Sequence, residues 1–302
     1  MTATLERLMR HRRRRLWPAV TVLASLLLAG AVITTWPQTA GTTTSHAATR
    51  GLTVATWNMC GVARWKCAGT GSRTAKRDAA AHLATGGGAR VIFLQEACAS
   101  DVAAVRDRLG DSWSSAFRPY TWRGASGHTS TVPCVTGGKE PAGFAVLSAT
   151  RLAAARLVAS QQPTLGLRRG ILCAVVADHA LTVCNAHLSR PGDDRAHPQW
   201  ELRDDQLRAL AAAAPDDRVV YGGDLNVDPP DQGSPVGVWP SLSYSGHREC
   251  DQASADGRSG RPTHVSGHKL DYLFTGLPRV RCSVRDTHVS DHYALLLTVR
   301  TD

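Results

Sequence analysis

Asp224 and Asn226 stand two residues apart at the end of an apolar, β-branched run, and Gly222 and Gly223 directly precede them. In an extended segment, side chains two residues apart leave the same face of the backbone. Glycine lets the chain turn tightly and lets a ligand approach closely. An ionised carboxylate accepts a hydrogen bond or a proton, and a neutral amide both donates and accepts. The pair could therefore hold water against a phosphorus or carbonyl centre, although an ordinary turn explains the same pattern.

Five more apolar segments carry a carboxylate, amide or imidazole at or beside their ends. These side chains are Asn58, Glu96, His187, Asp271 and the neighbouring pair Asp291 and His292. A single Glu after a strand is usually solvated, and a single His more often completes the hydrogen bonds of a loop than serves catalysis. Charged residues rarely interrupt buried strands without a partner or a metal ion. The whole set therefore favours a functional site over six unrelated solvated positions.

The segments around these residues predict strands interspersed with helices. Strands are expected over residues 52–58, 91–96, 143–148, 152–159, 171–176, 181–186, 270–274, 280–284 and 293–299, and over the run that ends at Asp224. Helices are expected over residues 72–85, 100–109 and 196–213, the first two with Ser72 and Ser100 as N-caps and Gly86 and Gly110 as stops. Residues 124–141 are rich in Gly, Ser and Thr and are expected to form a long loop. Neither an internal repeat nor a second domain boundary is evident after residue 50.

The positive charge of the chain is concentrated at its N-terminus. The 302 residues carry a net charge of +10, and residues 1–47 hold six arginines and one glutamate, a local charge of +5. The remaining residues therefore carry the other +5, which is mild for a chain of this size. A basic surface favours polyanions such as nucleic acid or anionic lipid, so this charge permits such a partner without identifying it.

Residues 1–47 have the order of an export signal. Basic residues extend to Arg15, an apolar run follows from Leu16 to about Trp36, and Ser45-His46-Ala47 offers small residues for cleavage after Ala47. The rival is an uncleaved membrane anchor, since about 20 apolar residues span a bilayer and the arginines would remain inside. Both alternatives place residues 48–302, expected to form one domain, outside the cytoplasm. We expect the cleaved, secreted form.

All eight cysteines lie in the part expected to be exported, where an even number predicts disulfides. A two-residue turn at Asp178-His179 would set Cys173 directly opposite Cys184, as a hydrogen-bonded pair with Cα atoms about 5.5 Å apart. That spacing permits a disulfide. A bridge between Cys250 and Cys282 is the second expectation, and the other four cysteines are left unassigned. The absence of a C-x-x-C spacing argues against zinc binding.

Taken together, the motifs resemble the endonuclease/exonuclease/phosphatase superfamily. The motifs are Trp57-Asn58, Gln95-Glu96, Asn185-Ala186-His187-Leu188, Gly223-Asp224-Leu225-Asn226, Leu270-Asp271-Tyr272 and Ser290-Asp291-His292. They occur in the order of the family and cover about residues 51–302. The resemblance implies a deoxyribonuclease I-like α/β fold, a four-layer sandwich of two mainly antiparallel β-sheets flanked by helices. The site would lie at one edge of the sheets.

The resemblance also implies hydrolysis of a phosphoester with the help of a divalent cation. Asn58, Glu96 and Asp291 would be the metal ligands, and hard oxygen ligands of this kind suit Mg²⁺ or Mn²⁺. Such an ion stabilises charge on the phosphoryl oxygens and on the leaving group. The resemblance thus predicts magnesium as the cofactor, with manganese as the alternative.

Five further residues receive roles through the same resemblance. Asp224 would orient and deprotonate the attacking water, and Asn226 would fix that water or a phosphate oxygen. His187 and His292 would hold the phosphate from either side, with Asp271 orienting His292. Whether Asp224 or His292 is the general base stays open.

Some family positions have no clear counterpart in this chain. Arg169 is the candidate for a phosphate-contacting arginine, with Arg168 as its rival. Glu140 could be the acid that orients His187, and the phosphate-contacting tyrosine of many family nucleases is not assigned. Asp271 follows Leu270 and precedes Tyr272, which departs from the Cys-Asp-Arg signature of the inositol phosphatases and argues against that branch.

Three functions are compatible with this set of residues. A secreted nuclease acting on DNA or RNA is favoured by the expected export, the disulfides and the mildly basic chain. A sphingomyelinase-like phospholipid phosphodiesterase is the alternative; it would need an exposed apolar loop, for which Trp239 and Tyr244 are the candidates. A binding domain that has lost its catalytic ligands is disfavoured, because a residue is present for each main role. We expect a monomer with no protein partner.

Overall fold

The computed structural model describes residues 51–302 except 66, 68–69 and 242. The expected export segment, residues 1–47, lies outside the described residues. No helix among the described residues is both long enough and apolar enough to cross a membrane.

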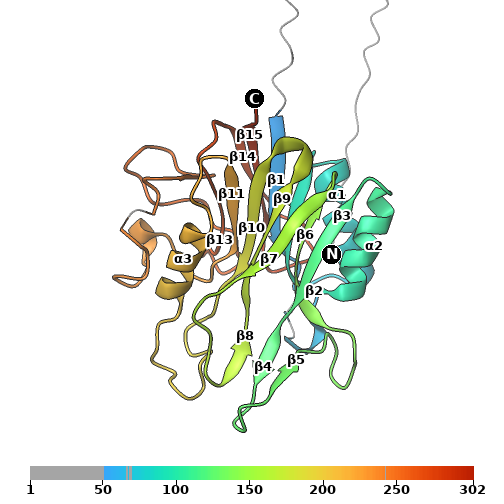
Figure 1. Cartoon of the computed structure of the whole chain (residues 1–302), viewed down its shortest axis with the longest axis vertical. Coiled ribbons are helices and arrows are strands. Elements are labelled where there is room, and N and C mark those ends of the chain that lie inside the picture. The colour runs from blue at the N-terminus through green and yellow to red at the C-terminus, as the bar shows by residue number, and fades with distance from the viewer. Residues whose placement is uncertain (1–50, 66, 68–69, 242) are drawn as a thin grey trace, which may run out of the picture. The chain divides into compact units, whose positions relative to one another are not determined.

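Two six-stranded sheets face each other and form the centre of the domain (Figure 1). The first sheet has the order β14 (Arg279–Arg285), β15 (Ala294–Arg300), β1 (Gly51–Asn58), β2 (Val91–Cys98), β6 (Ala142–Ser148) and β3 (Ser114–Pro119). The second has the order β12 (Arg248–Glu249), β13 (Asp271–Thr275), β11 (Val219–Asp224), β10 (Leu181–His187), β9 (Gly170–Val176) and β7 (Leu152–Val158). Only β1 with β2 and β10 with β11 pair in parallel within these sheets.

A third, small sheet lies beyond one end of the sandwich (Figure 1). It consists of β5 (Thr129–Thr131), β4 (Thr121–Arg123) and β8 (Gly166–Arg168), all paired antiparallel. The expectation of one long loop over residues 124–141 is therefore wrong in part, because Thr129–Thr131 pairs with β4. The threonines of β5 favour extended backbone, which composition alone does not distinguish from a loop.

Helices cover the outer faces of both large sheets. The helices α1 (Arg73–Thr85) and α2 (Ala99–Leu109) pack their buried alanines, valines and leucines on the first sheet. The helix α3 (Arg203–Ala212) packs on the second sheet with Leu207 and Leu210. Short 3-10 turns occur at Ala63–Trp65, Ala177–His179 and Pro230–Gln232. The four layers of the predicted deoxyribonuclease I-like sandwich are thus confirmed.

Side-chain alternation along the strands separates three apolar clusters. In β1, Leu52 and Val54 join the cluster between the sheets, whereas Ala55 and Trp57 join the cluster under α1 and α2. In β11, Val220 faces the first cluster and Tyr221 faces the cluster under α3. Successive strand residues point to opposite faces, so β1 and β11 each contribute to two of these clusters.

Two predicted helix starts are wrong. The third helix begins at Arg203 rather than at residue 196, because Asp194 accepts hydrogen bonds from the backbone of Ala196 and His197 and so holds a turn there. Pro198 also disfavours helical backbone at the residue before it. Ser100 is not an N-cap, since α2 starts at Ala99 with Cys98 as its cap residue. Ser72 does cap α1, accepting a hydrogen bond from the amide of Ala75.

All eight cysteines form disulfides. Both predicted bridges, Cys173–Cys184 and Cys250–Cys282, are confirmed, and Cys60–Cys67 and Cys98–Cys134 complete the set. The predicted register of β9 and β10 is correct, with Cys173 opposite Cys184. Their Cα atoms are 4.0 Å apart, the close spacing of a non-hydrogen-bonded pair, so the expected type of pair is wrong. The 3-10 turn at Ala177–His179 replaces the expected two-residue turn.

Candidate active site

Strand ends from both sheets bring the predicted polar residues to one end of the sandwich. Asn58 ends β1, His187 ends β10 and Asp224 ends β11. Asp224 lies directly opposite His187 in the parallel ladder and opposite Asp271 in the antiparallel ladder. These positions continue the inward-facing rows of their strands, so their side chains meet between the two sheets at the point where the apolar core ends.

The glycine pair before Asp224 is required by close backbone contacts. A Cβ atom on Gly222 would lie 1.9 Å from the carbonyl oxygen of Tyr272, and one on Gly223 would lie 1.9 Å from that of Ala186. Gly223 also has a φ of +125°, which side chains rarely tolerate. The glycines therefore hold Asp224 in register with its two neighbouring strands.

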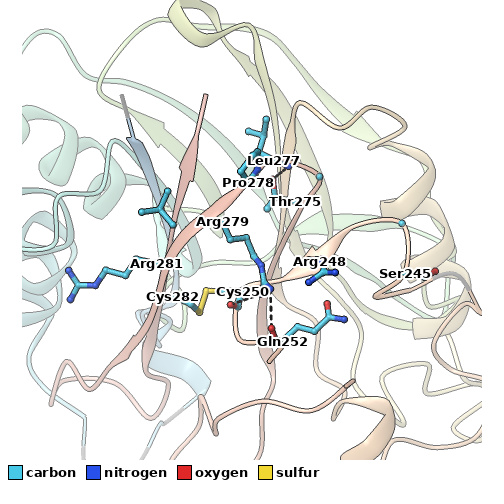
Figure 2. Close-up of a pocket in the computed structure, with 13 residues that line it drawn as sticks. Ser245, Arg248, Cys250, Gln252, Thr275, Leu277, Pro278, Arg279, Arg281 and Cys282 are labelled. Carbon is cyan, nitrogen blue, oxygen red and sulfur yellow. Dashed lines mark hydrogen bonds between the residues drawn. A yellow bond between two sulfur atoms is a disulfide. The ribbon is translucent and has the colours of Figure 1, made fainter. Parts of the chain in front are cut away.

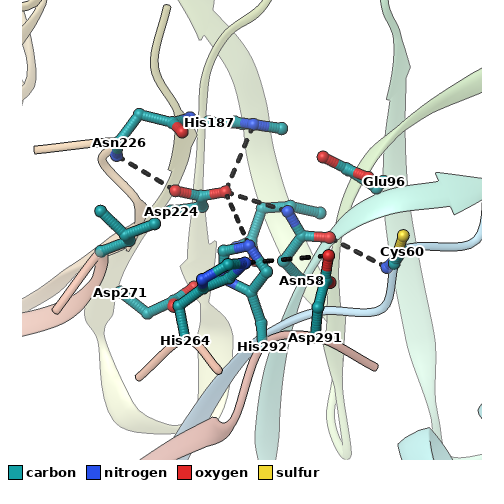
Figure 3. Close-up of polar contacts among 12 residues, drawn as sticks. Asn58, Cys60, Glu96, His187, Asp224, Asn226, His264, Asp271, Asp291 and His292 are labelled. Atoms are coloured by element: carbon teal, nitrogen blue, oxygen red, sulfur yellow. Dashed lines mark hydrogen bonds and ion pairs between the residues drawn. The ribbon is translucent and has the colours of Figure 1, made fainter. Parts of the chain in front are cut away.

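Asp224 is the centre of the polar network (Figure 3). Its Oδ2 accepts a hydrogen bond from Asn58 Nδ2 at 2.9 Å and lies 3.4 Å from His187 Nε2 and 3.8 Å from His292 Nε2. Its Oδ1 accepts from the backbone amide of Asn226 at 3.1 Å. Burial raises the pKa of Asp224, and the positive charge of His292 opposes that rise.

Asp271 lies beside His292, the imidazole that it was predicted to orient. Asp271 Oδ2 lies 2.9 Å from His292 Nδ1, and both side chains are buried. Burial alone lowers the pKa of His292, but the charges of Asp271 and Asp224 outweigh it and raise that pKa to about 10. His292 is therefore protonated at neutral pH, and both of its ring nitrogens can donate hydrogen bonds.

Tyr120, which the sequence did not single out, orients His187. The Tyr120 hydroxyl accepts a hydrogen bond from the Glu96 amide at 3.0 Å and lies 2.6 Å from His187 Nδ1. His187 Nε2 faces the Asp224 carboxylate, which accepts hydrogen bonds. The proton of the neutral ring therefore lies on Nε2, and Nδ1 accepts from the Tyr120 hydroxyl. Burial, then the charge of Arg169, lowers the pKa of His187 well below its usual value, so the ring is neutral.

The suggestion that Glu140 orients His187 is wrong. Glu140 instead accepts hydrogen bonds from Arg73 and from the Ser100 amide in the first turn of α2. A carboxylate is favourable at a helix N-terminus, where backbone amides lack partners within the helix. Tyr120 was missed because Pro119 directly precedes it and no strand was predicted around it.

Glu96 sits in an irregular part of β2. The pairing of β2 with β6 shifts register between Leu94 and Ala97, and Glu96 has a φ of +51°. A β-bulge of this kind redirects a side chain out of the regular alternation. Burial raises the pKa of Glu96, whereas the neighbouring Asn58 amide and the charge of His292 oppose that rise. Glu96, which is partly buried, and Asp224, which is fully buried, thus form a pair of acids whose pKa values are both raised.

Oxygen atoms suited to a divalent cation lie on the Glu96 side of this network (Figure 3). Asn58 has a fixed orientation, because its Nδ2 donates to Asp224 and its Oδ1 accepts from the Cys60 amide. Asp291 is half-buried beside it. Ligand atoms of Glu96, His187 and Asp224 lie within 4.8 Å of one another. The donor set and the raised pKa values of both acids fit a bound divalent cation.

His264 is a second residue of the site that the sequence analysis missed. Its ring centroid lies 4.7 Å from that of His292, and its Nε2 lies 3.8 Å from Asp291 Oδ2. Its Nδ1 accepts a hydrogen bond from the Ser266 amide, which leaves Nε2 to carry the proton of the neutral ring. Burial alone raises the pKa of Asp291, but the neighbouring His264 and the charge of His292 lower it.

Arg169, rather than its rival Arg168, lines the cavity above these residues. The cavity has a volume of about 1020 Å³ and is also lined by Glu96, Asp224, Asn226 and His292. Arg169 forms an ion pair with Asp193, and its side chain is nearly fully buried. Asn226 has a φ of +52° and donates from its side chain to the Leu188 carbonyl.

A second cavity, of about 640 Å³, lies at the other end of β13 (Figure 2). Arg248, Arg279 and Arg281 line it, and its lining contains neither a carboxylate nor an imidazole. Arg279 is held by the carbonyls of Glu249, Cys250 and Gln252. This second cavity therefore lacks the acid and base groups present in the first.

The fold and the first cavity together define a class of hydrolase with two facing sheets and a buried carboxylate between imidazoles. A model of the Endonuclease/Exonuclease/phosphatase family matches residues 55–292. The chain belongs to this family. Since the activities in the family name all hydrolyse phosphoester bonds, the protein is a hydrolase acting on ester bonds.

Solved structures with the same fold come from bacteria and animals. An endonuclease/exonuclease/phosphatase from Beutenbergia cavernae is 21% identical, with a TM-score of 0.58, over 83% of this chain and 72% of that one. A humanized TDP2 from D. rerio is 14% identical, with a TM-score of 0.57, over 82% and 98%. The catalytic domain of human nocturnin is 18% identical, with a TM-score of 0.55, over 82% and 92%. No match was found among curated proteins.

Proposed function

We propose that this protein is an exported, metal-dependent nuclease that hydrolyses phosphodiester bonds of DNA or RNA. One observation carries the proposal: a single oxygen, Asp224 Oδ2, lies within 4 Å of the polar side-chain nitrogens of Asn58, His187 and His292. A carboxylate held in this way beside two imidazoles is positioned to take a proton from water while the imidazoles bind phosphate.

In the proposed reaction, Asp224 orients a water molecule and takes its proton as the water oxygen bonds to phosphorus. The bond from phosphorus to the leaving oxygen breaks, and the leaving group departs with the electron pair. His187 and His292 donate hydrogen bonds from Nε2 to the phosphoryl oxygens, where negative charge develops. Because His292 is already protonated at neutral pH, Asp224 rather than His292 acts as the base.

Glu96, Asn58 and Asp291 would hold the divalent cation, for which Mg²⁺ is the first candidate and Mn²⁺ the second. When bound, the cation stabilises charge on the phosphate and on the leaving oxygen. His264 holds Asp291 rather than binding the cation, because its Nε2 carries the proton.

Nucleic acid is favoured over phospholipid by two observations. ANGEL2, described as a 2′,3′-cyclic phosphatase, shares the fold with a TM-score of 0.52 in complex with adenosine-2′,3′-vanadate, a nucleoside ligand. The aromatic residues suggested for lipid contact are not available: Tyr244 is 3% exposed, and the Trp239 ring packs against Tyr244 and Tyr272. An exposed apolar loop for lipid is therefore not formed by these residues.

Export is proposed from the N-terminal signal pattern together with the disulfides. Four disulfides in one domain are typical of proteins that fold in an oxidising compartment. Fractionation of culture with and without residues 1–47 tests this proposal. Retention of the full chain in the reducing cytoplasm would contradict it.

A metal-dependence assay across three substrates, plasmid DNA, RNA and sphingomyelin, tests the function. The purified domain should nick plasmid DNA or cleave RNA with Mg²⁺ and stop when a chelator is added. Glu96→Ala and His292→Ala should each abolish cleavage, whereas Asp111→Asn, an exposed acid after α2, should not. Release of phosphocholine from sphingomyelin without cleavage of nucleic acid would replace the nuclease with the phospholipid alternative. Unchanged activity of both alanine variants would contradict the site itself.

A further inference from the structure

Two tryptophans from separate elements line the cavity of the proposed active site. Trp65 ends the 3-10 turn Ala63–Trp65, which follows β1, and Trp122 lies in β4 of the small sheet. Both side chains are partly exposed. Tryptophan side chains in a wet, charged cavity offer large flat surfaces without contributing acid or base chemistry. The proposed hydrolysis of a phosphodiester does not itself require them.

The Trp65 ring is fixed beside the phosphate-binding end of the site. Its centroid lies 5.6 Å from that of Tyr120, whose hydroxyl orients His187. The disulfide Cys60–Cys67 closes the short loop that carries Trp65. A planar group stacked on Trp65 would therefore be held near the imidazole that is proposed to bind phosphate.

The Trp122 ring is paired with a cation. The guanidinium of Arg195 lies 4.5 Å from the ring centroid, and the Arg195 amide donates to the carbonyl of Leu165 just before β8. Trp122 itself is paired with Leu167 of β8. Arg195 and Trp122 thus form a pair of flat groups on the cavity wall, one of them positively charged.

Two more arginines line the cavity and are available to phosphate groups. Arg64 directly precedes Trp65, and Arg190 follows β10 by three residues. Neither guanidinium has an ion pair or a side-chain hydrogen bond within the described part of the chain, and Arg64 and Arg190 are exposed. The buried acids, by contrast, lie within the Asp224 network. Arg64 and Arg190 therefore place two positive charges on the cavity wall that have no ion-pair partner among the described residues.

We propose that this site takes single-stranded nucleic acid, with unpaired bases stacked on Trp65 and on the Trp122–Arg195 pair. The inference rests on the proposed nuclease function and names its substrate class. Aromatic rings that alternate with arginines bind single strands because every unpaired base has a face free to stack. In a duplex those faces are already stacked, and the bases cannot reach rings inside a cavity. A protein that recognises a duplex would instead need contacts to its phosphates or to the base edges in its grooves.

The inference is tested by cleavage of one labelled oligonucleotide, alone and annealed to its complement. Bis(p-nitrophenyl) phosphate, a small diester without bases, is the comparison substrate. We expect the single strand to be cleaved at least about tenfold faster than the duplex, since stacking contributes on the order of one factor of ten per base. Trp122→Ala should reduce kcat/KM for the single strand at least about tenfold more than for the small diester. Trp122→Phe should restore most of the kcat/KM for the single strand that Trp122→Ala loses.

Binding measured without metal gives a readout independent of catalysis. Trp65→Ala and Trp122→Ala should each weaken binding of the single strand, whereas Trp200→Ala, a partly exposed tryptophan stacked on His197 outside the cavity, should not. Arg64→Ala or Arg190→Ala should lower the slope of log affinity against log salt by about 0.7 each.

The outcomes separate this inference from the function on which it rests. Equal or faster cleavage of the duplex, or equal losses on both substrates for Trp122→Ala, would overturn the single-strand assignment and leave the nuclease intact. Hydrolysis of the small diester without cleavage of any nucleic acid would overturn the nuclease, and the substrate class with it.

Discussion

Asn58 Nδ2 donates a hydrogen bond to Asp224 Oδ2 at 2.9 Å. This bond connects the two sheets through residues that are 166 positions apart in the chain. Asn58 ends β1 in the first sheet, and Asp224 ends β11 in the second. Both residues are 1% exposed. The bond fixes the amide so that its oxygen faces the Glu96 side of the site. One contact therefore positions both the proposed base and a proposed metal ligand.

Removal of this amide should damage catalysis more than folding. Asn58→Ala removes the amide donor to Asp224 Oδ2, and we expect kcat to fall about 100-fold or more. Asn58→Asp should be at least as harmful, because a second carboxylate beside Asp224 raises the pKa of the proposed base. Steady-state kinetics and thermal unfolding measure the two effects. The control Gln199→Ala removes an exposed amide and should change neither; a normal kcat for Asn58→Ala would contradict the assigned network.

The pair of His292 and Asp271 predicts a dependence of stability on pH. The pKa of His292 is raised to about 10, above its usual value of about 6.5. Its stabilising contribution is therefore complete below about pH 6.5 and disappears as pH rises through 10. In metal-free protein, Asp271→Asn should lower stability at pH 7 and remove most of this dependence.

The same pair can be followed directly by NMR. The ring signals of His292 in metal-free protein should titrate with a midpoint near 10, and Asp271→Asn should shift the midpoint downward. The exposed His128 provides an internal reference in the same spectrum. A His292 midpoint that is the same in wild type and Asp271→Asn would show that the carboxylate does not hold the imidazolium.

Gly223→Ala should be strongly destabilising. The new Cβ would meet the carbonyl oxygen of Ala186 at 1.9 Å, and the backbone has a φ of +125°. We expect a loss of about 3 kcal/mol or more in the free energy of unfolding, measured by denaturant titration. Gly246→Ala is the matched control, since no heavy atom lies within 4 Å of its added Cβ. A near-normal stability for Gly223→Ala would mean that β10 and β11 can separate without cost.

Asp194 should stabilise the loop beside the cavity above acid pH. Burial alone raises the pKa of Asp194, but hydrogen bonds from Thr164, Ala196 and His197 outweigh it and lower that pKa to about 2. Its contribution, about 2 kcal/mol, is present above the unfolded pKa of about 3.9 and is lost as pH falls towards 2. Asp194→Asn should remove this amount at pH 7 and flatten the acid limb of the unfolding curve. The exposed Asp111→Asn should leave both unchanged.

The sequence alone predicted the strands that carry the site because the pattern of each strand is local. Apolar runs closed by Asn58, Glu96, His187 and Asp224 are visible without knowing how the strands pair. The same holds for the hairpin that sets Cys173 opposite Cys184, since a short turn fixes its register. The family, the fold class and the hydrolase class followed from these local features in their order along the chain.

Only the tertiary structure showed how Tyr120, His264 and Glu140 are used. Tyr120 reaches His187 across 67 residues, and Glu140 reaches Ser100 rather than His187. Trp239 and Tyr244, which looked available for lipid, are packed together beside the second sheet. Residue type and spacing encode the period of a strand and the geometry of a turn, but not which distant strand ends meet. Which strand ends lie together depends on the order of strands in the two sheets and on how the sheets pack. That packing places Asp224 between two imidazoles.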